Sequence, residues 1–157
     1  MSKNQTTYLT AEGAAKIKIE LEDLKGPKRE AIARRLRDAI QMGDLSENAD
    51  YHKAKEDQGF LEGRIMELEF VLRNAVIVEA SNTPKNTVAV GTRVTVQEIG
   101  FDREVYYLVG AQEADPRTGK ISNESPIGQA LMEHREGDTV EAETPGGMIK
   151  MKILKIE

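Results

Sequence analysis

Two carboxylates three positions apart, Asp44 and Glu47, are the side chains best suited to chemistry in this chain of 157 residues. Asp50 follows them, and positions 43–51 contain no basic residue. Carboxylate oxygens are the ligands that Mg²⁺ prefers, but one or two of them bind the ion weakly because it keeps most of its waters. We therefore expect this acidic segment to help hold a divalent cation in the active site of another protein.

Helix capping is the alternative explanation of the same spacing. Asp44 and Glu47 fit the two ends of a capping box, and Ser46 could instead cap the following helix in a later register. A cap would contribute about 1 kcal/mol and would require no further function. The two explanations are compatible if one side chain caps while the other coordinates, so the residues alone leave both open.

The rest of the composition excludes several other kinds of site. There is no Cys, and the two His residues, His52 and His134, are isolated, so we expect them at the surface and expect no zinc or thiolate site. The sequence contains no phosphate-binding glycine loop, nucleophile elbow or carboxylate–His triad. It also lacks an apolar run of about 18 residues and a signal peptide, which predicts a cytoplasmic protein with no membrane segment.

The charge distribution argues against a free-standing nucleic-acid binder, because the net charge is −5. Basic residues are nevertheless concentrated on both sides of the acidic segment. Positions 28–37 contain five of them against Glu30 alone, and Lys53 and Lys55 follow the segment. A solvated helix face is the ordinary explanation of such a run.

Two long helical patterns flank the acidic segment. The first begins after Thr10, the expected N-cap, and runs to about Met42, with a slip at Gly26-Pro27 where proline predicts a kink or local unwinding. The second alternates steps of three and four, as in a seam against one partner helix. A short turn makes the two helices antiparallel neighbours, so we predict a coiled-coil hairpin with the acids at its tip. The seam predicted for the second helix is Tyr51, Ala54, Gln58, Leu61, Ile65, Leu68 and Leu72.

The second half of the chain changes to strand-like patterns. After Val76-Ile77-Val78 comes a polar loop at 81–86, and Pro145-Gly146-Gly147 predicts a hairpin turn between the last two strands. Ser125 and Pro126 read as the cap and first position of one short helix. We predict an α+β protein with a helical hairpin over 1–76 and a small, mostly antiparallel β domain over 77–157. Strands are expected at 88–90, 93–96, 104–109, 138–142 and 148–156.

The order of the motifs carries a family resemblance. The acidic segment Gly43–Tyr51 and the later Glu62-Gly63-Arg64-Ile65 resemble the Gre family of bacterial transcription elongation factors. The likeness continues through Ala114-Asp115-Pro116 and Ser125-Pro126-Ile127-Gly128 to Thr144-Pro145-Gly146-Gly147, and so covers essentially the whole chain.

The resemblance implies a protein that binds bacterial RNA polymerase and is not itself an enzyme. Its C-terminal domain, similar in fold to FK506-binding proteins, would dock at the rim of the secondary channel, with contacts at Ser125, Pro126, Ile127 and Gly128. Its coiled coil would enter the channel, where Asp44 and Glu47 would help hold a second Mg²⁺ shared with the polymerase. The polymerase would then cleave the 3′ end of the nascent RNA in a backtracked complex.

The resemblance also bears on the basic residues near the acidic segment. Lys55 matches a position that is commonly basic in the family, and Arg37 and Lys53 are further nucleic-acid-facing candidates by position. Ile40 and Glu30 depart from the family's usual Arg and Pro.

A channel binder that inhibits the polymerase without stimulating cleavage is the main alternative function, although such a protein would not need the acid pair. A prolyl isomerase would need more converging aromatics than Phe101, Tyr106 and Tyr107, and a tRNA-binding arm would need a basic tip.

Overall fold

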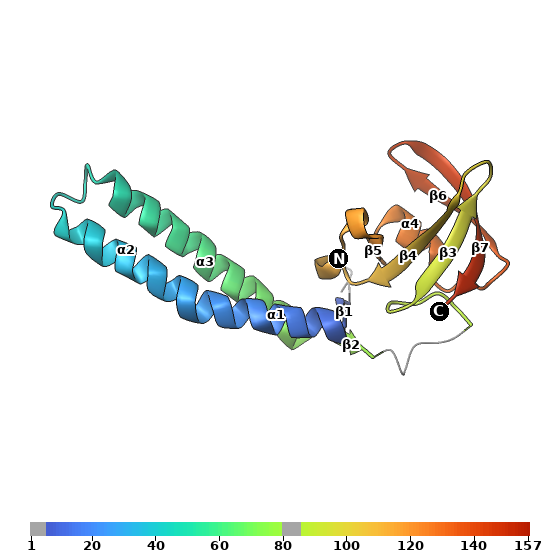
Figure 1. The fold of residues 1–157 in the computed structure, drawn as a ribbon, viewed down its shortest axis with the longest axis horizontal. Coiled ribbons are helices and arrows are strands. Elements are labelled where there is room, and N and C mark those ends of the chain that lie inside the picture. The colour runs from blue at the N-terminus through green and yellow to red at the C-terminus, as the bar shows by residue number, and fades with distance from the viewer. Residues whose placement is uncertain (1–5, 80–85) are drawn as a thin grey trace, which may run out of the picture. The chain divides into compact units, whose positions relative to one another are not determined.

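The computed structural model of the chain describes residues 6–79 and 86–157 (Figure 1). Ala15–Asn74 form one compact unit, a helical hairpin, and the described residues before and after it form the other. These units differ from the predicted ranges 1–76 and 77–157, because strand β1 (Tyr8–Thr10) pairs in parallel with β2 (Val76–Val78). Of the predicted loop at 81–86, only Asn86 lies in the described part of the chain.

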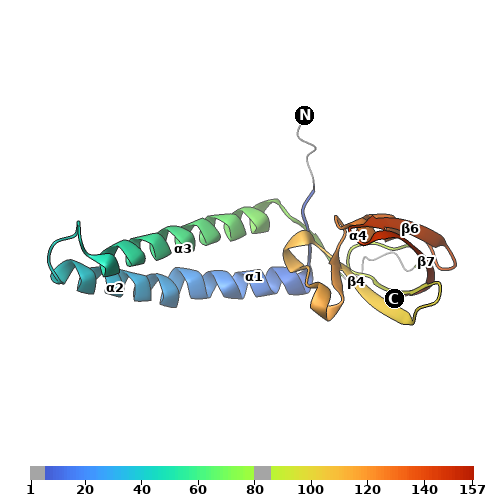
Figure 2. The ribbon, with the colours of Figure 1, turned by 90° about the horizontal axis from the view of Figure 1, so that it is seen from above.

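The hairpin consists of α1 (Ala11–Asp23), a π-helical turn η1 (Leu24–Lys28), α2 (Arg29–Gln41) and the returning helix α3 (Ala49–Asn74). Figures 1 and 2 show α3 running beside the first helical arm, with the connecting loop at one end of the hairpin. The Oγ1 atom of Thr10 accepts a hydrogen bond from the backbone N of Gly13 at 3.0 Å, which confirms Thr10 as the N-cap.

The π turn explains the slip in the apolar spacing of the first arm. Buried residues follow steps of three and four up to Leu24, and beyond the turn Leu36 and Ala39 are buried one position later than a continued pattern would place them. A π turn contains about one residue more than an α turn. The turn at Gly26-Pro27 therefore absorbs the additional residue, and the helix continues as predicted.

The seam of α3 follows the prediction, although Tyr51 and Gln58 are only half-buried, and it departs from the prediction near its C-terminal end. Ala54, Leu61, Ile65 and Leu68 are buried, but the next buried residue is Val71, and Leu72 is only half-buried. An α-helix has 3.6 residues per turn, so a strict 3.5-residue pattern drifts around it and a neighbouring residue moves into the contact.

Ion pairs join α3 to the first arm along the hairpin. Arg29 donates two hydrogen bonds to the carboxylate of Glu62, both of 2.9 Å, and Arg64 donates to Glu20 at 2.9 Å. Two of these residues, Glu62 and Arg64, belong to the Glu62–Ile65 motif. Because these side chains remain 41–46% exposed, each pair adds little to net stability, but together they favour one register of the two helices.

The second unit contains a curled sheet with the strand order β5-β4-β3-β7-β6 and one short helix, α4 (Figure 2). All neighbouring strands are antiparallel except β4 and β5, which confirms the predicted α+β class. The elements are β3 (Arg93–Glu98), β4 (Arg103–Val109), the 3₁₀ turns η3 (Ala111–Glu113) and η4 (Pro116–Thr118), β5 (Lys120–Ser122), α4 (Pro126–Leu131), β6 (Thr139–Thr144) and β7 (Gly147–Ile156).

A β-bulge explains the imperfect alternation of β7. Met151 and Ile153 are buried, but the register with β3 shifts where Val96 pairs with Ile153 and Thr95 with Lys155. The additional residue, Leu154, restores the inward direction at Ile156.

The predicted strand at 88–90 is wrong. Val88 and Val90 are buried, but the segment runs into a turn, and Val88 exchanges backbone hydrogen bonds with the chain that follows α4, at His134 and Glu133. Its alternating valines therefore fill the core without belonging to a strand. Among the described residues, no helix has the length and apolarity to cross a membrane.

Candidate functional site

The acidic residues lie in the loop between α2 and α3, which we call the tip loop (residues 42–48). The loop leaves α2 at Gly43, whose φ of +117° is disfavoured for other residues. Residues 42–47 are all exposed, and Asn48 is half-buried. No buried residue lies between Ala39 at the end of α2 and Ala54 in α3, so apolar packing stops short of the loop.

Asp44 is held by its neighbour Ser46. Its Oδ1 atom accepts hydrogen bonds from the backbone N and the Oγ of Ser46, both at 2.9 Å. These two bonds lower the pKa of Asp44 below its ordinary value, and the side chain is therefore ionised at neutral pH. Within the described residues Oδ2 makes no hydrogen bond, which leaves one carboxylate oxygen directed by the turn and open to a ligand.

Glu47 is exposed and forms no hydrogen bond or ion pair with any residue that the structure describes. Asp50 lies in the first turn of α3, where a negative charge interacts favourably with the helix dipole. His52 and His134 are both exposed, as predicted. The tip loop thus presents carboxylates that the fold itself does not use for packing.

Asn48 caps α3, which corrects the capping alternative. Its Oδ1 atom accepts from the backbone N of Tyr51 at 3.1 Å, and its Nδ2 atom donates to the carbonyl of Ala39 at 2.7 Å. Neither Asp44 nor Ser46 makes the cap. The sequence analysis missed Asn48, although asparagine immediately before a helical pattern is itself a capping signal.

The donor chemistry of the tip loop fits a shared Mg²⁺ ion. Asp44 and Glu47 offer oxygen ligands, but among the described residues no group of three or more potential ligands lies close enough to hold a metal. Two carboxylates give weak binding of an ion that keeps its waters. The pair therefore fits only as part of a larger ligand set.

The three nucleic-acid-facing candidates differ in whether they already have a carboxylate partner. Lys53 forms ion pairs with Asp57 and Glu56, both of 3.2 Å, and these two carboxylates, Asp57 first, raise the pKa of Lys53. Lys55 reaches only the amide oxygen of Gln58, at 3.4 Å, and Arg37 is exposed with no partner in the described part of the chain. Arg37 and Lys55 thus remain available to an external anion, whereas Lys53 already has carboxylate partners.

The segment Ser125–Gly128 begins α4, as predicted. The Oγ of Ser125 accepts from the backbone N of Gly128 at 3.1 Å and donates to the carbonyl of Ser122 at 2.7 Å. A Cβ at Gly128 would lie 1.9 Å from that same carbonyl oxygen. Ser125 and Gly128 are therefore needed to build the helix start, while Pro126 is exposed and Ile127 half-buried.

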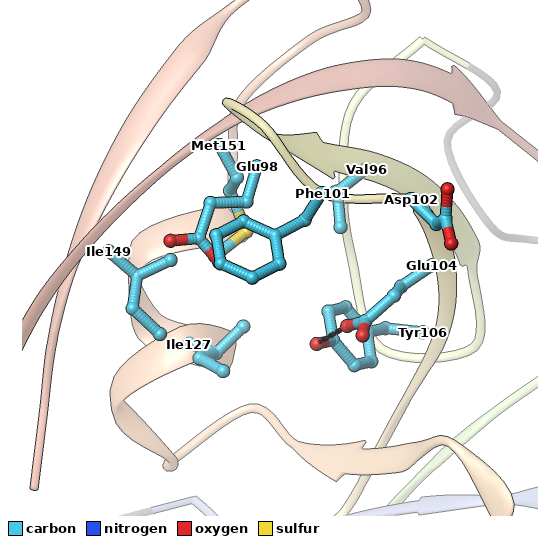
Figure 3. A pocket seen from close by; sticks show the side chains of 9 residues that line it. All are labelled: Val96, Glu98, Phe101, Asp102, Glu104, Tyr106, Ile127, Ile149 and Met151. Atoms are coloured by element: carbon cyan, nitrogen blue, oxygen red, sulfur yellow. Dashed lines mark hydrogen bonds between the residues drawn. The ribbon is translucent and has the colours of Figure 1, made fainter. Parts of the chain in front are cut away.

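Ile127 also lines a pocket of about 260 Å³ beside β3, β4 and β7 (Figure 3). Ile127 and Ile149 lie on one side of Phe101, and the hydrogen-bonded pair Tyr106 and Glu104 lies on the other. Tyr107 does not line it, and its ring instead lies 5.4 Å from the Arg93 guanidinium. Of the three aromatics considered for a prolyl isomerase, only Phe101 and Tyr106 line this pocket. The lining residues are Val96, Glu98, Phe101, Asp102, Glu104, Tyr106, Ile127, Ile149 and Met151.

Comparisons with known proteins cover both halves of the chain. The family model described as "Transcription elongation factor, N-terminal" matches residues 7–77, and the model described as "Transcription elongation factor, GreA/GreB, C-term" matches residues 83–157. The chain is 46% identical over 157 residues to the transcription elongation factor GreA of Acetivibrio thermocellus, with 99% of each chain covered. It is 48% identical to that of Clostridium beijerinckii, with 99% of this chain and 98% of the relative covered.

Among solved structures, the chain is similar to GreA factor homolog 1 of Thermus thermophilus, with 27% identity, 98% and 99% of the two chains covered and a TM-score of 0.45. The matches of the two family models and the high identity over the full chain confirm the resemblance based on the acidic segment and the later motifs. The chain therefore belongs to the GreA/GreB family of transcription elongation factors.

Proposed function

We propose that this protein is a transcription elongation factor that binds bacterial RNA polymerase and stimulates the polymerase's own cleavage of the RNA 3′ end in backtracked complexes. The printed name of its relatives, transcription elongation factor GreA, supports the general role. The hairpin would enter the secondary channel, and the C-terminal unit would dock at the rim of that channel through the Ser125–Gly128 segment. Catalysis would belong to the polymerase.

The observation that carries the proposal is the state of the acid pair. Asp44 and Glu47 are exposed, they do not cap α3, and Asp44 is already ionised and held by Ser46. Like charges crowded in a loop with little packing are unfavourable unless something outside the chain uses them. A hairpin that ends in such carboxylates is suited to extend the ligand set of a metal site in a larger enzyme.

In the polymerase, Asp44 and Glu47 would supply some of the oxygen ligands of a second Mg²⁺ and would orient the attacking water. When bound, that ion supplies stabilisation of the attacking oxygen in two-metal phosphodiester hydrolysis. Arg37 and Lys55, which have no carboxylate partner among the described residues, would face the displaced RNA.

The test uses purified polymerase halted in a backtracked complex, with and without this protein, scored for shortened transcript. Asp44→Asn and Glu47→Gln are each expected to lower stimulated cleavage by a factor of about 100 or more, since a preorganised charged group at a reacting centre contributes on that scale. Binding to the polymerase and thermal stability are expected to remain near wild type, because neither side chain packs against the fold.

Asp38→Asn provides a matched control, because it removes the same charge from an exposed position of α2 outside the tip loop. It is expected to leave cleavage unchanged. Wild-type protein that binds the polymerase and yields no shortened transcript would contradict the proposal and would support the alternative, a non-cleaving regulator of the secondary channel.

A further inference from the structure

We propose that Asn48 is a positioning residue for the acid pair: its amide joins the end of α2 to the start of α3 and thereby fixes the loop that carries Asp44 and Glu47. The inference rests on the proposed function, because the loop has to present its carboxylates in one geometry only if they complete a metal site. It assigns to Asn48 a role beyond ending a helix.

The orientation of the Asn48 amide follows from its two partners. The carbonyl of Ala39 can only accept a hydrogen bond, and the backbone N–H of Tyr51 can only donate one. Nδ2 must therefore face Ala39, at 2.7 Å, and Oδ1 must face Tyr51, at 3.1 Å. Only a side chain with both a donor and an acceptor at this length can make the two bonds together.

Apolar packing does not replace these bonds at the tip. The last buried seam residues are Ala39, which is 3% exposed, and Ala54, which is fully buried. A hollow of about 210 Å³ lies beside Ala39, and its lining includes Met42 of the tip loop and Asp50 of α3. Beyond this point the two ends of the loop are held near each other chiefly by the Asn48 amide.

Within the tip loop, the other hydrogen bonds are local or long. In the described part of the chain, the Asp44 side chain bonds only to Ser46, two residues away, and the backbone N of Gly43 reaches the carbonyl of Ile40 at 3.5 Å. The Nε2 of His52 lies 3.4 Å from the carbonyl of Ser46. These contacts shape short segments of the loop, whereas Asn48 is bonded to a residue nine positions away on the other helix.

Asn48→Ser separates positioning from capping. Serine is about as good an N-cap as asparagine, so α3 is expected to keep its start and its helicity, and the protein its melting temperature. The shorter serine side chain, however, cannot reach the carbonyl of Ala39. Stimulated cleavage is expected to fall by about 10- to 100-fold, because small misplacements of reacting groups have effects of this size. The Mg²⁺ concentration for half-maximal cleavage is expected to rise, which loss of a cap alone would not cause.

A second measurement makes the test independent of cleavage. The fast backbone motion of the amides of residues 44–47, measured by NMR relaxation, is expected to increase in Asn48→Ser. Asn74→Ser is the matched control, since Asn74 lies at the other end of α3 and, among the described residues, its Nδ2 donates only to the carbonyl of Phe70, at 2.8 Å. This variant is expected to change neither the loop amides nor cleavage.

Each result decides the proposal. A more mobile loop with slower, more Mg²⁺-dependent cleavage supports it. An unchanged loop overturns it whatever the cleavage rate, and a mobile loop with wild-type cleavage and wild-type Mg²⁺ dependence overturns it as well. If wild-type protein stimulates no cleavage at all, the proposed function fails and the positioning role fails with it, while the NMR result still reports whether Asn48 restrains the loop.

Discussion

Among single residues, the tip loop divides its tasks between neighbouring polar side chains. Asn48 satisfies the backbone at both helix ends, Ser46 holds Asp44, and Glu47 remains without a partner among the described residues. Because the capping is done by a neutral amide, neither carboxylate has to give up an oxygen to the start of α3. This division allows a stable helix start and an available acid pair to occur within five residues of each other.

Tyr106 gives a pH-dependent prediction at the same scale. Burial, and then its hydrogen bond to Glu104, raise the pKa of Tyr106 from 10.0 to about 12. The folded protein therefore keeps this proton at pH values where the unfolded chain loses it. The resulting stability is fully present below about pH 10 and is lost as the pH rises through about 12. Unfolding by urea at a series of alkaline pH values is expected to show this loss.

Two variants check the assignment to Tyr106. Tyr106→Phe has no proton to lose and is expected to show a flatter alkaline profile. Glu104→Gln removes the charge beside the hydroxyl and is expected to lower the pKa seen by tyrosine absorbance. An alkaline profile of Tyr106→Phe that matches wild type would show that another group is responsible.

The acidic residues of the site could be predicted from the sequence, but their supporting contacts could not. Asp44 and Glu47 are conspicuous because positions 43–51 contain no basic residue. Asp44, Ser46 and Asn48 are all good capping residues, and the choice among them depends on where α2 ends and on the distance to the carbonyl of Ala39. Similarly, the sequence does not show that Lys53 forms an ion pair with Asp57, or that Arg37 has no partner among the described residues.

Among the elements, α3 carries two glycines on its outer surface whose replacement should increase the stability of the helix. Gly59 and Gly63 lie in the helix interior, and an added Cβ at either would meet no atom within 4 Å. Glycine in such a position costs about 0.5–1 kcal/mol relative to alanine. Nothing within the described hairpin requires either glycine.

Gly59→Ala is therefore expected to stabilise the hairpin by about 0.5–1 kcal/mol, measured by urea unfolding followed by helical circular dichroism. Gly43→Ala is the opposing control, because the positive φ at Gly43 is unfavourable for alanine, and it is expected to destabilise. A loss of stability in Gly59→Ala would show that this surface of α3 is less open than the structure indicates.

The helices and strands themselves were largely predictable, since the helical and the strand spacing of apolar residues are both clear in the sequence. The departures have identifiable physical causes. Val71 replaces Leu72 because the helix period is 3.6 residues, and the alternation of β7 fails where a bulge adds Leu154. Val88 and Val90 alternate as in a strand, but their backbone bonds go to the turn after α4.

In the whole molecule, the start of the chain is joined to its second half by a carboxylate. Glu113 in η3 accepts from the backbone N of Thr10 at 2.8 Å and also from its Oγ1. A Cβ at Gly13 would lie 2.0 Å from the Cδ of Glu113, so glycine at this position gives the carboxylate its space. The two residues are 103 positions apart, and no local pattern in the sequence indicates that they meet.

Glu113→Ala is expected to lower the stability of the unit that contains the sheet by about 1–3 kcal/mol, because it leaves a part-buried backbone donor and a hydroxyl without their acceptor. Thermal unfolding of the full chain would measure the change. Glu124→Ala is a suitable control, since Glu124 is exposed and its side chain makes no hydrogen bond in the described residues. Equal melting temperatures for the two variants would rule out an anchoring role for Glu113.

The π turn at Leu24–Lys28 has a consequence for how such hairpins can change over evolution. A heptad seam normally tolerates length changes only in whole repeats, because a single inserted residue rotates everything beyond it away from the partner helix. Here one turn takes up the odd residue, so Leu21 before it and Leu36 after it both remain buried. A lineage that lacks this one residue could therefore form an ordinary α turn here and still present the same loop in the same orientation.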